Sequence, residues 1–275
     1  MYCVKKVLNN NAVLAVDLRR KEEVIFMGKG VGFNKKINEP FDDPEGVKKY
    51  HLQKQTSKGP SEKLINAVDP VYLEIANDII RLSEDKFKNV DNNVLLPLAD
   101  HIAFSIVRMD SQMDLSNPFT EDIRLLFEEE YTIAQKGKEI ISTRTGRTIP
   151  EDEVGYITLY IHSALTDTQV SESMQIPMII RQSIKRIENE CGIAIDMGSF
   201  AYNRLLYHIK CMLARVHNNE RLNNDMIEFT KEKCAYSFEV ARDICTKLEE
   251  KLGEHFTEKE ISYLALHIER IRTTE

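Results

Sequence analysis

An internal repeat constrains the fold of this chain more than any other sequence feature. Residues 99–108 align with residues 206–215, and residues 153–161 align with residues 260–268. Both alignments have the same offset of 107 residues, with no net gap between them. A constant offset over two separate segments predicts two successive copies of one domain, each of about 105 residues.

The repeated part of the chain has the periodicity of helices. From about residue 61, apolar residues recur at spacings of three and four, as in Leu64, Val68 and Val71, and this spacing is typical of amphipathic helices. Thr257 followed by Glu260 forms a capping-box signature, which predicts the start of the final helix. We therefore expect mostly helix from residue 61 to residue 272.

The N-terminal part has a different pattern, which predicts β structure. Residues 4–8 and 12–17 are strand candidates on either side of the turn sequence Asn9-Asn10-Asn11, as in a hairpin. Residues 24–27 form a third candidate, followed by the glycine-rich segment GKGVG at 28–32, which predicts a side-chain-poor strand or loop. The polar stretch 51–60 predicts a linker to the helical part.

The charges of the two parts have opposite signs. Residues 1–57 contain 11 basic and 7 acidic residues, a net charge of +4. The rest of the chain has a net charge of −11, so that the whole chain carries −7. A basic head on an acidic body indicates that only the head contacts a polyanion. Because four charges are few, ordinary surface variation is the alternative.

The composition is that of a soluble globular protein. Hydrophobic residues make up 42% and charged residues 29% of the chain, and no apolar run is long enough for a membrane span or a signal peptide. We therefore expect a cytoplasmic protein. The five cysteines are odd in number and form no CxxC pair, which predicts reduced thiols with no metal or redox role.

The repeat also pairs histidine positions. It places His101 opposite His208, and Tyr160 opposite His267. His162 lies about 200° around the helix from Tyr160 and should point elsewhere. A structural role is the alternative for any single histidine, but recurrence at a duplicated position favours a function for His101 and His208.

An arginine follows each of the aligned histidines. Arg108 and Arg215 lie seven residues after His101 and His208, two turns along the same helical face. Each arginine is a candidate for pairing with a phosphoryl group by charge-assisted hydrogen bonds. A surface arginine on a polar edge is the alternative.

Motifs typical of enzymes do not occur in this sequence. There is no HExxH, GxSxG or P-loop motif, and the glycines at 28, 30 and 32 lack the GxGxxG spacing. Nucleophilic catalysis needs a positioned nucleophile and base, and no such pattern is visible. We therefore expect a protein that is not an enzyme, with no catalytic residue, metal or cofactor.

Several strings together resemble one family over essentially the whole chain. KKVLNNNAVLAV and MGKGVGFNKK resemble the RNA-binding module of the BglG/SacY-type transcriptional antiterminators. LADHIAFSIVR, EVGYITLYIHSALT, RLLYHIKCMLARV and EISYLALHIERI resemble the family's two PTS regulation domains, in the family's order. The string YIHSALT is similar to the glucose-type branch.

The resemblance implies a multidomain α+β fold. A four-stranded antiparallel β module, the RNA-binding (co-antiterminator) domain, is expected at residues 1–57. A linker at 58–64 leads to two all-α helical-bundle regulation domains, at 65–170 and 171–275. The boundary between the two bundles is expected near 168–176, where the sequence around Asp167 leads toward Pro177.

The resemblance also implies a function. Such a protein binds, as a homodimer, a leader-mRNA antiterminator hairpin that overlaps an intrinsic terminator, so that the polymerase reads through. The phosphocarrier HPr and a sugar-specific enzyme II B domain of the phosphotransferase system (PTS) control this sugar-responsive activity by phosphorylating histidines. Neither DNA nor a membrane is expected as a partner.

Specific RNA-binding residues follow from the family motif and from side-chain chemistry. The motif places RNA contacts at Lys6, Asn11, Gly28, Lys29 and Phe33. Amides of the turn can contact base edges, lysines can contact phosphates and an aromatic ring can stack on an unpaired base; this chemistry adds Asn9, Asn10 and Lys35. A simple tight turn, solvated lysines and a core phenylalanine are the alternatives.

The regulatory histidines implied by the family are His101, His208 and His267. Position 160 departs from the family, which has histidine where this chain has Tyr160. A tyrosine cannot take the same part in phosphohistidine chemistry, so the first domain is expected to work through His101 alone or to carry an inactivating or mimicking change. We expect phosphorylation of the first domain to inactivate and that of the second to modulate or activate.

Two other functions compete with this interpretation. A PTS-regulated DNA-binding transcription activator would have similar regulation domains behind an N-terminal helix-turn-helix, but this N-terminus has the pattern of strands. A metal-dependent phosphohydrolase is the enzyme alternative, but Asp100-His101 reverses the HD order that such enzymes use.

Overall fold

The computed structural model describes residues 1–56, 58–113, 116–166, 168–223 and 226–273. Ser57 and Asp167, at two of the expected domain boundaries, lie outside the described residues. The chain forms two compact units, one of Met1–Pro118 with Glu129–Gln169 and one of Phe119–Glu128 with Val170–Glu275. Each unit is described by itself.

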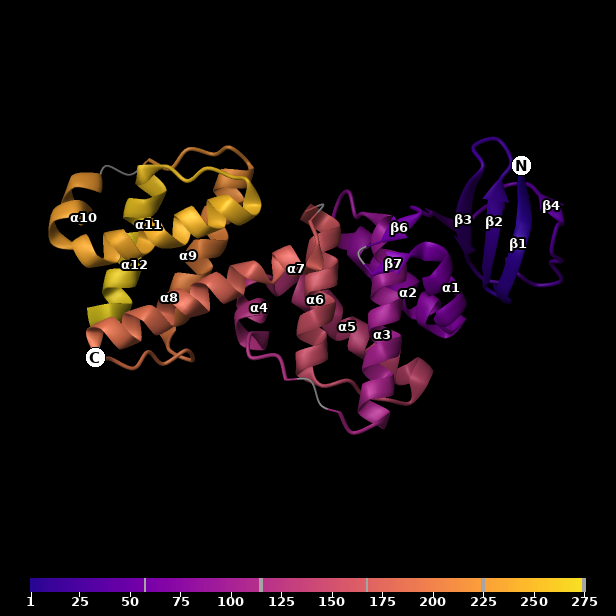
Figure 1. Ribbon diagram of the computed structural model, residues 1–275, viewed down its shortest axis with the longest axis horizontal. Coiled ribbons are helices and arrows are strands. Elements are labelled where there is room, and N and C mark those ends of the chain that lie inside the picture. The colour runs from indigo at the N-terminus through magenta and orange to yellow at the C-terminus, as the bar shows by residue number, and fades with distance from the viewer. Residues whose placement is uncertain (57, 114–115, 167, 224–225, 274–275) are drawn as a thin grey trace. The chain divides into compact units, whose positions relative to one another are not determined.

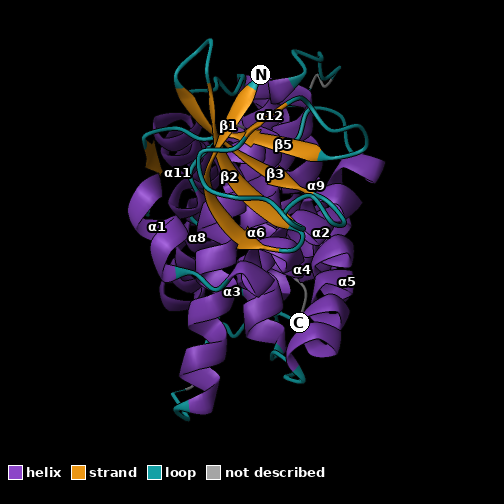
Figure 2. Cartoon of the chain, turned by 90° about the vertical axis from the view of Figure 1, so that its right-hand side faces the viewer, coloured by secondary structure: helices purple, strands orange, loops and turns teal. Residues whose placement is uncertain are grey.

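The N-terminal part is the expected antiparallel sheet, with one strand more than predicted. Its strand order is β4-β1-β2-β3-β5; Figure 1 labels β4 beside β1, and Figure 2 labels β1, β2, β3 and β5. The fifth strand arises because two residues of β4 pair with the start of β1. The strands are β1 (Tyr2–Asn9), β2 (Ala12–Asp17), β3 (Glu22–Met27), β4 (Pro40–Phe41) and β5 (Lys48–His51).

Both faces of the central strands β2 and β3 are buried, because apolar residues occupy both sets of alternating positions there. One face forms a core around Val4, Val13 and Phe26. The other face includes Ile25 and Tyr50, which are also buried. The hydroxyl of Tyr50 donates to Asn77 of the first helical bundle at 2.9 Å, so this face packs on the helices of the same unit.

The glycine-rich segment after β3 is a series of turns and not a strand. The Gly28 N–H donates to Asn11 O at 2.9 Å, and the Gly32 N–H donates to Asn10 O at 3.0 Å. These bonds tie the segment to the β1–β2 turn. A Cβ on Gly32 would lie 2.1 Å from the Asn9 carbonyl oxygen, so this close approach of two backbones requires glycine.

The helices of the first unit begin where the periodicity predicts. The expected linker contains a small hairpin, β6 (Gln55–Thr56) with β7 (Gly59–Pro60), and α1 follows directly. The side chain of Asp69 caps α2 by accepting from Val71 N at 2.9 Å. The helices are α1 (Ser61–Ala67), α2 (Pro70–Lys86), η1 (Asn92–Val94), α3 (Leu95–Asp110), α5 (Glu128–Thr145) and α6 (Glu151–Thr166).

The second unit repeats the helices of the first (Figure 1). Its last two helices begin and end 107 residues after α5 and α6, which confirms the repeat at the level of secondary structure. The helices are α4 (Thr120–Leu126), α7 (Val170–Ser173), α8 (Gln175–Cys191), α9 (Phe200–His217), α10 (Ile227–Lys233), α11 (Ala235–Leu252) and α12 (Glu258–Thr273).

Helix α4 departs from the simple repeat. Its counterpart α10 packs on α11 and α12, whereas α4 packs on α8 and α9 of the second unit. The buried carboxylate of Asp122 on α4 accepts from the Tyr202 hydroxyl at 2.8 Å and pairs with Arg181 at 2.7 Å. A polar anchor therefore attaches a helix of the first repeat to the second unit.

The capping-box signature correctly predicts where the final helix begins, but Glu260 has a different partner from the one that the signature implies. Helix α12 begins at Glu258, directly after Thr257 as predicted. The carboxylate of Glu260, however, accepts two hydrogen bonds from Arg215, so it is engaged in tertiary structure. Among the described residues, no helix has the length and apolar character needed to cross a bilayer.

Replacement of Gly32 by alanine should destabilise the N-terminal sheet by about 1–3 kcal/mol, because the added Cβ would collide with the Asn9 carbonyl. Urea denaturation of the purified chain would measure the change. Gly30→Ala is the matched control: Gly30 has a left-handed φ of +74° but open space around its Cβ position, so only backbone strain is added and the loss should be smaller. An equal loss at both positions would contradict the explanation.

Candidate functional site

The first histidine site lies between α3 and α6. The His101 side chain is buried, with 8% of its surface exposed. Its ring centroid lies 5.0 Å from that of Tyr160 and 5.7 Å from that of Tyr156. Burial lowers the pKa of His101 below its ordinary value, although the neighbouring Glu153 carboxylate, 3.2 Å from Nε2, opposes this shift. The ring is therefore mainly neutral at physiological pH.

The second site places two imidazole rings in direct contact. His208 on α9 and His267 on α12 stack with centroids 3.6 Å apart and planes 20° apart. Tyr263 lies edge-on to His208 at 5.4 Å. The repeat correctly predicts this pairing, because His208 and His267 correspond to His101 and Tyr160.

The stacked pair is held in the neutral state. Burial and then the neighbouring His208 lower the pKa of His267 to about 4. Burial, together with Arg204, Arg215 and Arg270, lowers the pKa of His208. Nε2 of His267 is buried and has no hydrogen-bond partner among the described residues. A neutral imidazole with an available lone pair is the nucleophilic form of histidine.

Both predicted phosphate-binding arginines are already paired with glutamates. Arg108 Nη2 lies 2.5 Å from Glu153 Oε1, and Arg215 donates to both oxygens of Glu260 at 3.0 and 2.7 Å. The two pairs are related by the offset of 107 residues, and neither arginine is the exposed surface residue of the alternative interpretation. Sequence reasoning missed the glutamates as site residues, although each begins one of the repeated segments.

A lysine from the β6–β7 hairpin covers the first site. Nζ of Lys58 lies 3.0 Å from Asp100 and 5.8 Å from the Tyr160 ring centroid. Burial alone would lower the pKa of Lys58, but Tyr160 and Asp100 raise it above its ordinary value. This cation next to His101 was not visible in the sequence, because no local pattern links residue 58 to residue 101.

His162 lies outside the two histidine sites, as its helical position predicts. Its Nδ1 is 2.9 Å from Glu130 on α5. In the repeat its position corresponds to Glu269, which accepts a hydrogen bond from Ser237 on α11, the counterpart of α5. Position 162 therefore belongs to a helix–helix contact.

The predicted RNA contacts gather at one end of the sheet. The β1–β2 turn and the segment 28–33 lie side by side through the two backbone hydrogen bonds described above. The Phe33 side chain is 64% exposed, so it is not a core residue. Lys29 is also exposed. Lys35, in contrast, pairs with Glu39 at 3.2 Å and lies over the Phe41 ring.

The turn asparagines use their amide oxygens within the sheet module. Asn9 Oδ1 accepts from the Asn11 N–H at 2.8 Å, and Asn11 Oδ1 accepts from the Gly30 N–H at 3.0 Å. Their Nδ2 groups point out of the module toward Glu74 on α2. Nζ of Lys6 donates to Asn66 on α1 at 2.9 Å. Sequence reasoning gave no signal for Asn66 and Glu74, which are polar residues of distant helices.

Comparisons with known proteins agree with this architecture. Residues 2–59 match the family described as the CAT RNA binding domain, and residues 53–164 and 181–271 match the PRD domain. Protein GlcT of Staphylococcus aureus strain bovine RF122 / ET3-1 is 30% identical over 272 residues, covering 97% of this chain and 95% of the relative. GlcT of strain Newman is similar to the same extent.

A solved structure is also similar to this chain. The crystal structure of GlcT CAT-PRDI matches with a TM-score of 0.50 and 36% sequence identity. The match covers 60% of this chain and 98% of that chain.

The fold and the sites define a regulatory protein in which an RNA-binding sheet module precedes two helical domains with paired histidine positions. The chain belongs to the family of BglG/SacY-type antiterminators with a CAT RNA-binding domain and PRD domains, and its similarity to GlcT places it in the glucose-type branch. It is a PTS-regulated RNA-binding antiterminator. The DNA-binding alternative is not favoured, because residues 2–59 match an RNA-binding domain.

The low pKa of His267 predicts a pH-dependent stability. Between pH 4 and 6.5 the unfolded chain binds more protons at this residue than the folded chain, so its contribution is complete above about pH 6.5 and is lost as the pH falls toward 4. His267→Gln should make stability less dependent on pH in this window, as measured by urea denaturation. His255→Gln, at an exposed histidine outside the site, is the control. An unchanged slope in H267Q would contradict the assignment.

Proposed function

We propose that the end of the sheet formed by the β1–β2 turn and residues 28–33 binds a hairpin in a leader mRNA, and that this hairpin overlaps an intrinsic terminator. The observation that carries the proposal is the exposed Phe33 ring beside the amide-bearing turn and the exposed Lys29. An exposed aromatic ring can stack on an unpaired base, and lysines can neutralise phosphates. Binding stabilises the antiterminator and allows read-through.

The contacts of this surface differ in chemistry. The proposed RNA-binding residues are Lys6, Asn9, Asn10, Asn11, Gly28, Lys29, Phe33 and Lys35. The Nδ2 groups of Asn9 and Asn11 are the proposed donors to RNA, because the amide oxygens of both residues already accept backbone hydrogen bonds. Gly28 is proposed to contact the RNA through its backbone, since a Cβ at this position would lie 3.0 Å from Val47 Cγ2 and so faces the module itself. Lys35 contributes charge while it remains paired with Glu39.

We propose that His101, His208 and His267 accept phosphoryl groups. A neutral ring nitrogen attacks phosphorus, and the bond between phosphorus and the donor protein breaks. HPr and a sugar-specific enzyme II B domain are the proposed donors. The new group carries negative charge and strong hydrogen-bond acceptors. Arg108 and Arg215 are the proposed partners for this group, after their ion pairs with Glu153 and Glu260 break.

The two regulation domains are proposed to act unequally. The second domain has two neutral imidazoles in contact, whereas the first has one imidazole beside the Tyr160 ring. Burial raises the pKa of Tyr160 above its ordinary value, so its phenol stays protonated and is a poor nucleophile. Phosphorylation of the first domain through His101 is proposed to inactivate, and that of the second to modulate or activate.

Further features of the proposal concern assembly, catalysis and domain limits. A homodimer would double the basic surface of the sheet module and suits a hairpin with two internal loops. In this proposal the chain works in the cytoplasm, has no catalytic activity of its own and binds neither DNA nor a membrane. The expected limits of the domains, at 1–57, 65–170 and 171–275, stay predictions.

Phe33→Ala should weaken binding of the leader hairpin, because one base loses its stacking partner. The loss of about 1–3 kcal/mol for such a contact corresponds to roughly 5- to 150-fold in Kd. Fluorescence anisotropy with the labelled RNA would measure it. Leu18→Ala is the control, since Leu18 is an exposed apolar residue in the β2–β3 turn, at the opposite end of the sheet. Equal Kd values for F33A and the unchanged chain would contradict the proposed surface.

Phosphotransfer in vitro should label His208 and His267 with HPr, and His101 with the enzyme II B domain. Peptide mapping by mass spectrometry under conditions that preserve phosphohistidine would locate the label. His162, which is of the same residue type but lies in a helix–helix contact, is the internal control and should stay unlabelled. Absence of label from all three proposed histidines would refute this part of the proposal.

A further inference from the structure

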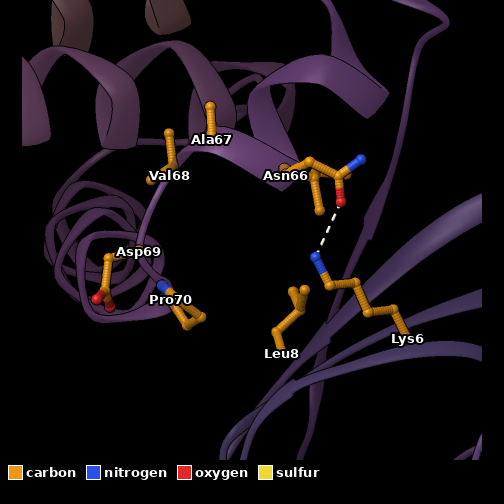
Figure 3. Close-up of a pocket in the computed structure, with 8 residues that line it drawn as sticks. Lys6, Leu8, Asn66, Ala67, Val68, Asp69 and Pro70 are labelled. Carbon is orange, nitrogen blue, oxygen red and sulfur yellow. Dashed lines mark hydrogen bonds between the residues drawn. The ribbon is translucent and has the colours of Figure 1, made fainter.

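Two helices of the first regulation domain contact the turn that is proposed to bind RNA. On α2, Glu74 Oε1 accepts from Asn9 Nδ2 at 2.6 Å, and Glu74 Oε2 accepts from Asn11 Nδ2 at 3.2 Å. On α1, Asn66 Oδ1 accepts from Lys6 Nζ at 2.9 Å (Figure 3). Three of the proposed RNA-binding side chains therefore donate to the chain's own helices.

These contacts engage the groups that RNA would need. The amide oxygens of Asn9 and Asn11 already accept backbone N–H groups of the sheet module, so the Nδ2 groups are the outward-facing ends of both side chains. A single carboxylate contacts both Nδ2 groups. Phosphate and base carbonyl oxygens are also hydrogen-bond acceptors. The Glu74 carboxylate therefore occupies the same amide donors that RNA oxygens would bind.

The Glu74 carboxylate is held in place from its own side. Arg144, near the end of α5, donates to Glu74 Oε2 at 2.9 Å and also pairs with Asp78 one turn along α2. Because this arginine fixes the side chain, the carboxylate is already oriented toward the turn. Charge-assisted hydrogen bonds of this kind are stronger than neutral ones.

The boundary near these contacts is not tightly packed. A cavity of about 400 Å³ lies between β1 and the α1–α2 connection, lined on one side by Lys6 and Leu8 and on the other by residues 65–70 (Figure 3). Beside this open space, the turn and β1 contact the helices through the polar side chains of Asn66 and Glu74, whereas the apolar face of the sheet around Ile25 and Tyr50 packs elsewhere. Such polar contacts can be exchanged for those of a polar ligand.

We propose that Asn66 and Glu74 form a docking surface for the β1–β2 turn, and that the leader RNA and this surface compete for the same side chains. The inference rests on the proposed function, because it requires that this turn binds RNA. Docking of the turn on α1 and α2 lowers RNA affinity, and RNA binding releases the turn from the first regulation domain. Docking of the turn and binding of RNA are linked equilibria: docking weakens RNA binding by the same free energy by which bound RNA weakens docking.

Glu74→Gln in the full chain tests this competition. The substitution removes the negative charge of the carboxylate that accepts from Asn9 Nδ2 and Asn11 Nδ2. The turn should therefore separate from α2 more readily. RNA binding should tighten by roughly three- to tenfold, since the docked state loses only the difference between a charge-assisted hydrogen bond and the neutral one that a glutamine amide oxygen can still accept. Anisotropy with a synthetic RNA hairpin copied from the leader upstream of a neighbouring transporter gene would measure Kd.

Asp78→Asn is the matched control. It also neutralises a carboxylate on α2 that pairs with Arg144, but among the described residues Asp78 makes no hydrogen bond with the turn asparagines. D78N should therefore bind RNA as the unchanged chain does. Equal tightening in D78N and E74Q would overturn the inference, because general loosening of α2 would then explain both.

A second measurement does not depend on RNA. The side-chain NH₂ signals of Asn9 and Asn11 in the NMR spectrum of the ¹⁵N-labelled chain should shift in E74Q and stay in place in D78N. Unmoved signals in E74Q would overturn the docking contact itself. If the hairpin binds the unchanged chain and E74Q with equal Kd, the competition fails while the proposed function stands. If it binds neither protein, the proposed function fails, and the competition fails with it.

Discussion

A buried arginine–glutamate pair joins the two helices that carry the histidine site in each repeat. Arg108 with Glu153, and Arg215 with Glu260, each connect residues 45 positions apart. Both glutamates are almost completely buried, so removal of either partner would leave an uncompensated charge at a cost of about 3–5 kcal/mol. The pair therefore sets the position of the histidine-bearing helices relative to each other.

The same framework supports two different sites. In the second unit it holds two stacked neutral imidazoles, and in the first it holds His101 under Tyr160 and Lys58. Lys58 comes from the hairpin that connects the RNA-binding sheet to the first bundle. A charge added at His101 would thus lie beside the connection to the sheet. Among the described residues, the cations Arg204 and Arg270 beside the second site come from its own helices, α9 and α12. The two histidine sites therefore differ both in the residue at position 160, which is tyrosine where the second site has His267, and in the lysine that lies beside it.

Most of the fold could be predicted from local sequence patterns. Alternation and an Asn turn predicted the first hairpin, and spacings of three and four predicted the start of the helices at Ser61. The edge strand β4 was missed, because two residues carry no periodic signal. Family motifs predicted the histidines, but not Glu153, Lys58 or Glu74, because each acts through a partner distant in sequence. The capping-box interpretation of Glu260 was incomplete, because the Arg215 guanidinium binds the carboxylate more strongly than a free backbone N–H would.

The sequence by itself determined the repeat, the order of sheet and helices, and the family to which the chain belongs. These properties follow from residue periodicity and from short motifs, which are local. The tertiary structure decided which charges meet: Arg108 with Glu153, Lys58 with Asp100, and Glu74 with the amides of Asn9 and Asn11. Such contacts depend on how whole helices pack, because packing alone brings polar groups from distant segments within hydrogen-bond distance.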